Sequence, residues 1–221
     1  MIYDLFRCIG LLLGYPLQLL FFKRKTYYED KKEQGRMVRG GALVISNHYS
    51  PLDYVMNMFL FPFRKLYVVM SEVMFRGKRK KLLAFLTKFH GGICSDRDIM
   101  GMKFIDDSVE VIENGGLVQI FPEAHITVDG KMHEFKTSYL MIALRSDAPI
   151  IPVIIDGQFG LFKRSHVIIG KKIYLSDYCT SLNPTKEEIL ALNDIVYKKC
   201  LALKADLDAR IAKKHKKEDK K

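Results

Sequence analysis

Tryptophan is absent from this 221-residue chain, and only four cysteines occur in it. The cysteines stand far apart in the sequence, and none belongs to a C-x-x-C pair of the kind that holds a metal or a redox disulfide. They are Cys8, Cys94, Cys179 and Cys200. This usage favours a reducing location that faces the cytosol.

Acidic residues are also scarce, because 25 Asp and Glu stand against 36 Lys and Arg, which gives a net charge of +11. Such an excess predicts an anionic partner. No nucleic-acid recognition motif accompanies the charge, so we expect a membrane surface or a phosphorylated substrate and no nucleic acid. The densest cluster, RGKRKK at 76–81, is either a solvated helix face or a contact for lipid headgroups, coenzyme A or acidic carrier protein.

One long apolar run is present near the N-terminus, at Cys8–Phe22. As a helix it would be about 22 Å long, shorter than the hydrocarbon core of about 30 Å. Pro16 is expected to kink or break it, and no small-residue cleavage site follows. We predict a shallow or re-entrant membrane anchor, with the cations of Lys23–Lys25 at the headgroups; the alternative is a buried core hairpin.

From residue 41 onward, strand-like apolar runs alternate with helical patterns. The expected strands are 42–46, 66–69, 92–94, 117–121, 150–155 and 167–175, and the expected helices are 51–60, 80–89, 100–113 and 137–145, followed by a long final helix. This alternation predicts an α/β fold with a mostly parallel central sheet covered by helices. The expected organisation is a membrane-associated segment at 1–30, an α/β domain at 31–212 and a frayed basic tail at 213–221.

A histidine and an aspartate occur together in VISNHYSPLDYV, residues 44–55. Ser50 and Pro51 are typical of a helix start, which places Asp53 in the first turn and His48 just before it. The imidazole can then fold back onto the carboxylate, which would leave its other nitrogen as a base. The alternative is that Asp53 only stabilises the helix start and His48 is an ordinary loop residue.

Three further stretches follow this one in a distinctive order. They are Gly92–Arg97, Phe121-Pro122-Glu123 and Pro149–Val153. Together with Asn47–Asp53, which has the form N-H-x-x-x-x-D, they resemble the four sequence blocks of the glycerolipid acyltransferase family, whose type member is 1-acylglycerol-3-phosphate acyltransferase. The resemblance covers roughly residues 40 to 156.

The resemblance implies a single-step acyl transfer in phospholipid biosynthesis. His48 would take the proton of a lysolipid hydroxyl while Asp53 orients the imidazole, and the oxygen would attack acyl-CoA or an acyl carrier protein. Amides near the start of the following helix would stabilise the oxyanion. The family uses no metal, no cofactor and no acyl-enzyme, which agrees with the lack of a G-x-S-x-G motif here. We expect substrate-binding roles for Arg97, Glu123 and Lys136, and membrane association on the cytoplasmic face.

Two departures from the family bear on the acceptor. Ala124, His125 and Ile126 stand where the third block normally reads G-T-R, and Met70 stands where many members have a lysine. Loss of these two cations weakens recognition of a phosphate monoester, so another lysophospholipid, an aminolipid or a glycolipid is an alternative acceptor. A non-catalytic membrane-binding protein on the same scaffold is the competing class. His125 and His133 lack a zinc-binding spacing, and we expect no metal site.

Overall fold

A computed structural model describes residues 2–61, 64–71, 91–95, 103–161, 163–179, 181 and 183–218. Its strands form one sheet, in the order β1-β7-β6-β2-β5-β3-β4. Their bounds are β1 Lys25–Tyr28, β2 Ala42–Ser46, β3 Leu66–Ser71, β4 Gly92–Ser95, β5 Leu117–Ile120, β6 Ile150–Ile155 and β7 His166–Ile169. All neighbours run parallel except β6 and β7, so the predicted mostly parallel α/β sheet is confirmed.

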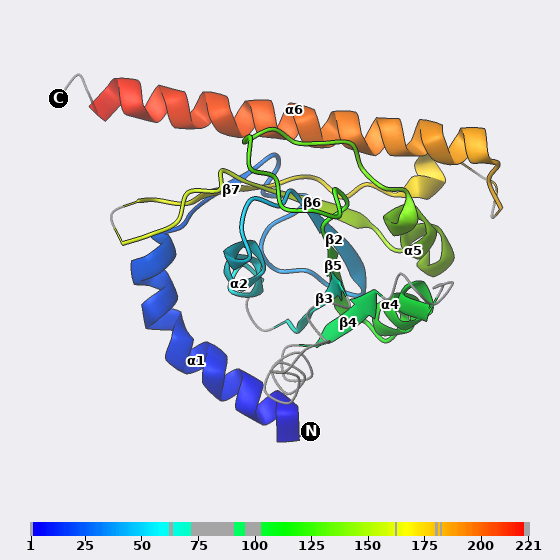
Figure 1. The fold of residues 1–221 in the computed structure, drawn as a ribbon, viewed down its shortest axis with the longest axis horizontal. Helices are drawn as coiled ribbons and strands as arrows, with labels where there is room; N and C mark the ends of the chain where they lie inside the picture. The colour runs from blue at the N-terminus through cyan, green and yellow to red at the C-terminus, as the bar shows by residue number, and fades with distance from the viewer. Residues whose placement is uncertain are drawn as a thin grey trace.

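Helices lie on both faces of the sheet (Figure 1). They are α1 Ile2–Phe22, α2 Leu52–Met58, α4 Lys103–Glu113, α5 Ser138–Ser146, the short 3₁₀ helix η2 Leu175–Asp177 and α6 Lys186–Glu218. One apolar core joins the sheet to α4, α5 and α6, and a second core lies on the opposite face, against α2 and the end of α1. The two cores exist because alternate strand residues point to opposite faces.

The central strands are apolar on both sides because both faces are covered. Every residue of β2, β5 and β6 is buried, as expected for strands in the middle of a parallel sheet. The long final helix starts with a capping box. Its two bonds run from Thr185 N–H to Glu188 Oε2 (2.7 Å) and from Glu188 N–H to Thr185 Oγ1 (3.2 Å).

The N-terminal segment differs from the prediction in three ways. First, α1 is continuous through Pro16, which neither ends nor interrupts it. Second, β1 lies within the segment assigned to the anchor, so the sheet already begins at Lys25. Third, Arg24 does not lie free at a headgroup position, because its guanidinium donates to the carbonyls of Met56 (3.3 Å) and Phe59 (3.2 Å) at the end of α2.

The outer side of α1 is apolar and exposed, and the helix lies along the outside of the molecule (Figure 1). Leu12 and Leu13 are 74% and 70% exposed. In contrast, Gln18 and Phe22 are buried on the inner side. In the described part of the chain, no helix combines the length and apolar character needed to cross a membrane.

The C-terminal residues also differ from the prediction. Instead of fraying from Lys213, α6 continues to Glu218, and its end extends past the sheet (Figure 1). Three ion pairs at i,i+4 spacing lie along its exposed side: Lys198–Asp194, Lys204–Asp208 and Arg210–Asp206. Such pairs support a helix that has solvent on most sides.

Candidate active site

Three neighbouring strands place polar residues at one edge of the sheet. β2 lies between β5 and β6, and all three run in the same direction. His48 follows the end of β2, and Glu123 follows the end of β5, and the two residues are hydrogen-bonded to each other at this edge. The predicted Arg97 follows the edge strand β4 and lies outside the described residues.

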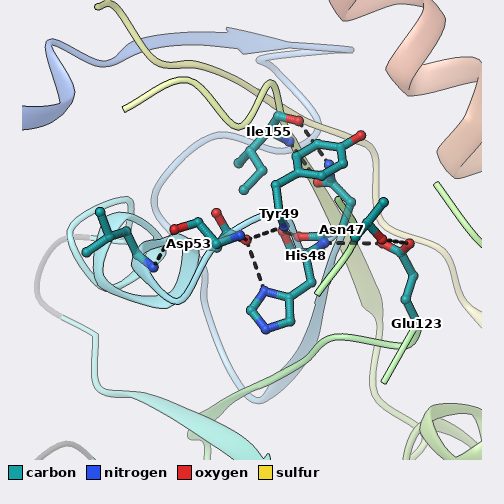
Figure 2. A network of polar contacts seen from close by, with 10 residues as sticks. Asn47, His48, Tyr49, Asp53, Glu123 and Ile155 are labelled. Carbon is teal, nitrogen blue, oxygen red and sulfur yellow. Dashed lines mark hydrogen bonds and ion pairs between the residues drawn. The ribbon is translucent and has the colours of Figure 1, made fainter. Parts of the chain in front are cut away.

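His48 and Asp53 form a hydrogen-bonded pair. The distance from His48 Nδ1 to Asp53 Oδ2 is 3.0 Å, with the histidine side chain 19% exposed and the aspartate fully buried. A carboxylate only accepts hydrogen bonds, so Nδ1 carries the hydrogen and Nε2 is left as the basic nitrogen. In Figure 2 the imidazole extends away from the surrounding polar network, with Nε2 on its far side.

The same carboxylate oxygen also organises the turn that carries the histidine. Asp53 Oδ2 accepts the N–H of Tyr49 at 2.6 Å and the N–H of Ser50 at 2.8 Å. These amides are therefore directed at the aspartate and not at a reacting carbonyl, so the prediction that amides at this helix start stabilise an oxyanion is wrong for these two. Phe121 stacks on the imidazole, with ring centroids 4.0 Å apart.

Asn47 fixes the turn to the neighbouring strand β6. Its Nδ2 donates to the carbonyl of Ile155, and the N–H of Ile155 donates to Asn47 Oδ1, both at 2.9 Å (Figure 2). Just after β6, Gly157 lies directly against the Tyr49 ring; a Cβ atom there would come within 2.7 Å of Tyr49 Cδ2. The backbone on each side of His48 is thus held by residues more than a hundred positions away.

Glu123 supports the other side of the turn. It is fully buried, and its Oε1 accepts the N–H of His48 at 3.2 Å. Its Oε2 accepts the hydroxyl of Thr127 at 2.9 Å and the N–H of His133 at 2.8 Å. Thr127 in turn donates its N–H to the His48 carbonyl at 2.7 Å. These contacts show Glu123 holding the turn that carries His48; its substrate-binding role stays a prediction.

The remaining predicted residues lie on the loop between β5 and α5. Lys136 is exposed, and its backbone N–H donates to the carbonyl of Pro122 at 2.8 Å. Ile126, at the position of the family's arginine, is 41% exposed. Ala124 adopts a left-handed conformation with φ of 58°, which a glycine accepts more readily. His125 and His133 have ring centroids 5.3 Å apart.

Two arginines hold the far end of α2, the helix that carries Asp53. Arg36 donates from Nε to the Leu60 carbonyl at 2.6 Å and from Nη2 to the Phe59 carbonyl at 3.0 Å, and Arg24 reaches the Phe59 carbonyl as well. Cations are favourable at a helix C-terminus. Burial, and then the neighbouring Arg36, lower the pKa of Arg24 to about 10, so the Arg24 guanidinium remains charged at neutral pH.

Sequence reasoning identified the His48–Asp53 pair but not its supports, which are Asn47, Thr127 and Phe121. A signal for Asn47 was present, because it is the first residue of the N-H-x-x-x-x-D block.

Within the described residues, no group of three or more His, Cys, Asp or Glu is arranged to hold a metal ion. Two surface hollows lie elsewhere, one lined by Glu29 and Lys171 and the other by Tyr67 and Glu110.

Comparisons with known proteins agree with this arrangement. A family model described as Acyltransferase matches residues 23–156. A 1-acyl-sn-glycerol-3-phosphate acyltransferase of Limnanthes alba is 32% identical over 117 residues, 52% of this chain and 41% of the relative. A putative 1-acyl-sn-glycerol-3-phosphate acyltransferase of Caenorhabditis elegans, acl-2, is 31% identical over 148 residues, 63% of this chain and 48% of that protein. The chain thus spans less than half the length of these relatives.

A solved structure shows the same fold. The crystal structure of the 1-acyl-sn-glycerophosphate (LPA) acyltransferase PlsC from Thermotoga maritima superposes with a TM-score of 0.57. The two proteins are 18% identical, and the match covers 83% of this chain and 74% of that one. At this identity the likeness concerns the fold alone.

Proposed function

Because this chain belongs to the Acyltransferase family, we propose that it transfers a fatty acyl group from acyl-CoA or acyl carrier protein to a hydroxyl of a lysophospholipid such as 1-acylglycerol-3-phosphate. The observation that carries the proposal is the His48–Asp53 pair, with Nδ1 bound to the carboxylate at 3.0 Å and Nε2 directed away from it. The full set of supports around this pair favours an enzyme over a non-catalytic protein on the same scaffold.

The proposed reaction uses His48 first as a base and then as an acid. Nε2 removes the proton from the acceptor hydroxyl as its oxygen attacks the thioester carbonyl, and the buried Asp53 carboxylate stabilises the resulting imidazolium. The tetrahedral intermediate then collapses, the carbon–sulfur bond breaks, and the imidazolium returns its proton to the leaving thiolate. The products are an acylated lipid and a free thiol, and the enzyme returns to its starting state.

The family's default acceptor is a phosphate monoester, and two residues are proposed to hold it. Arg97 and the exposed Lys136 keep their positions in the family blocks. A second acceptor class, a lysolipid without the phosphate monoester, is favoured by the apolar Ile126 at the position of the family's arginine. Lipid acceptors of both classes reside in membranes, so we propose membrane association on the cytoplasmic face. The exposed leucines of α1 support the association with a membrane.

The test is a screen of the purified protein with both donors against a panel of lysolipids. Lysophosphatidate, lysophospholipids with other headgroups and a glycolipid are offered with acyl-CoA or acyl carrier protein, and released thiol is measured. Transfer to at least one lysolipid that disappears in His48→Ala is expected. If no donor and acceptor pair gives turnover above that of the variant, the proposed function is wrong.

A further inference from the structure

Asp53 has a second carboxylate oxygen whose environment the catalytic contacts leave unexplained. Oδ2 receives three hydrogen bonds, from the His48 imidazole and from two backbone amides. Oδ1 is buried, and no donor among the described residues reaches it. Asn57 lies one helical turn further along α2, is also fully buried, and has neither Nδ2 nor Oδ1 hydrogen-bonded within the described chain. Residues four apart share one face of a helix, so these two groups are neighbours.

The sheet offers a matching polar group on the other side of the same layer. Gln119 in β5 is fully buried, and both atoms of its amide also lack a partner in the described structure. Gln119 shares its face of the sheet with Leu117, because residues two apart on a strand point the same way. Leu117 packs in one cluster with Met56 and Leu60 of α2. Gln119 therefore points into the layer between the sheet and α2.

The three side chains also lie at compatible heights. α2 follows the carboxyl end of β2, and the chain then returns to the amino end of β3, which runs in the same direction as β2, so α2 leads back along the sheet from its carboxyl edge. One helical turn from Asp53 to Asn57 covers about 6 Å, which is close to the rise of two strand residues. Gln119 is the second-last residue of β5, one strand residue before its carboxyl end, and so it also lies back from the edge of the sheet. Asn57 and Gln119 thus both lie inside this buried layer, further from the edge of the sheet than Asp53.

Five polar atoms of these three side chains are buried without a partner in the described residues. Each buried atom without a hydrogen bond lowers stability, and five together would offset most of the stability of an ordinary domain. Folded proteins satisfy such groups with internal water, which typically makes about three hydrogen bonds to them. We propose that ordered water occupies this layer and joins Asn57 and Gln119 to Asp53 Oδ1, so that Asn57 is a positioning residue for the catalytic pair.

The role of Asn57 follows from the geometry of the carboxylate and depends on the proposed function. Hydrogen bonds at Oδ1 fix the rotation of the carboxylate about its Cβ–Cγ bond, and this rotation decides where Oδ2 meets His48 Nδ1. Without them the imidazole is held less firmly, and Nε2 spends less time aligned with the acceptor hydroxyl. Substrate binding does not involve this buried layer, so the effect falls on kcat and not on KM.

The test replaces Asn57 by leucine, which is similar in size but has no hydrogen-bonding group. Asn57→Leu is expected to lower kcat about ten- to a hundredfold, with KM within about twofold. Gln18→Leu is the matched control, because Gln18 is another buried amide without a partner in the described chain, but it lies in α1, away from the catalytic turn. Gln18→Leu is expected to retain kcat. An unchanged kcat in Asn57→Leu, or an equal loss in Gln18→Leu, would overturn the proposal.

Two further variants separate positioning from a general loss of stability. Asn57→Ser keeps a hydroxyl and leaves room for water, so it is expected to recover at least about a third of the wild-type kcat. In the Asp53→Asn background, Asn57→Leu is expected to cause no further loss, because both changes act on the same hydrogen bond. Additive losses, or a serine variant as impaired as the leucine variant, would contradict the assignment.

A crystal structure of the full chain at a resolution that shows ordered water tests the layer itself, without any assay. Electron density for water within hydrogen-bond distance of Asn57, Gln119 and Asp53 Oδ1 is expected. A layer without such density would overturn the inference even if the enzyme is active. If instead the wild-type protein shows no acyl transfer while the water is present, it is the proposed function that fails.

Discussion

At the scale of single residues, the proposed chemistry depends on which nitrogen of His48 carries the hydrogen. Asp53 is placed to hold that hydrogen on Nδ1 and also accepts two backbone amides. His48→Ala is expected to lower kcat at least about a hundredfold, because the base is removed. Asp53→Asn is expected to be severely impaired as well, since an amide group can present its NH₂ to Nδ1 and favour the wrong tautomer. Thiol release and thermal unfolding are measured in parallel; near-normal kcat in His48→Ala would contradict the mechanism.

Ala124 gives a prediction about stability, because its φ of 58° strains a side chain with a Cβ atom. Ala124→Gly is expected to stabilise the protein by about 0.5–1 kcal/mol, as relief of strain exceeds the added entropy of the unfolded chain. Gly130 lies in the same loop with φ of 72° and nothing within 4 Å of an added Cβ. Gly130→Ala is the reciprocal control and is expected to lower stability by a similar amount. Urea unfolding measures both, and a change of the same sign in the two variants would refute the argument.

Ile126 bears on the choice of acceptor. It is 41% exposed at the position of the family's arginine, on the loop that is hydrogen-bonded to His48. Ile126→Arg combined with Ala124→Gly is expected to raise kcat/KM for lysophosphatidate relative to a lysolipid without the phosphate monoester. A charge-assisted hydrogen bond of about 1.5–3 kcal/mol corresponds to about ten- to a hundredfold. The measurement is competition between the two acceptors. If wild type already prefers lysophosphatidate strongly and the variant changes nothing, the phosphate is bound elsewhere.

At the scale of elements, α1 divides into an outer apolar side and an inner side that belongs to the fold. Leu12, Leu13 and Leu20 are exposed, whereas Gln18 and Phe22 are buried. Replacing the three leucines by serine is expected to weaken binding to phospholipid vesicles with little effect on folding, because each contributes buried area only when inserted in lipid. Co-sedimentation measures the binding, which high salt should change little in wild type. Leu190→Ser on α6 is the control, since Leu190 is 53% exposed. Equal vesicle binding by the triple variant and wild type would contradict the proposal.

The elements show what local sequence could and could not reveal. The histidine–aspartate pair was predictable because its two residues lie five apart, within one turn. Asn47 and Glu123 act through strand neighbours, and strand order cannot be read from local periodicity. Pro16 was expected to break α1 but is tolerated in it, because tertiary packing on α2 outweighs local preference. α6 continues past Lys213, as the extension of a helix that ion pairs support as far as Arg210, although composition alone suggested that this end would fray.

At the scale of the whole molecule, α6 connects the C-terminal region to the loop that supports His48. Asn193 Nδ2 donates to the Phe135 carbonyl at 2.9 Å, and its Oδ1 accepts the hydroxyl of Tyr139 at 2.9 Å. Burial raises the pKa of the Tyr139 phenol, which therefore stays neutral and needs an acceptor. Asn193→Ala is expected to lower the free energy of unfolding by about 1–3 kcal/mol, because a buried hydroxyl loses its partner.

The neighbouring Asp194 provides the control for Asn193. Its ion pair with Lys198 is solvent-exposed, so Asp194→Ala is expected to change stability by less than about 1 kcal/mol. Urea unfolding of both variants gives the comparison. Equal losses would show that any disturbance of α6 is sufficient and that the contact with the loop is not the cause.

The bond between Asn47 and Ile155 has a consequence for how the protein is made. The two residues are 108 positions apart, so during synthesis the histidine and its aspartate leave the ribosome well before the strand that fixes them. At roughly 5–20 residues per second, the delay is of the order of 5–20 seconds. During that time the turn has its local hydrogen bonds but not its anchor on β6. Because such long-range pairing is slow to form, catalytic competence would arise late in folding, after the N-terminal apolar helix has had time to meet a membrane.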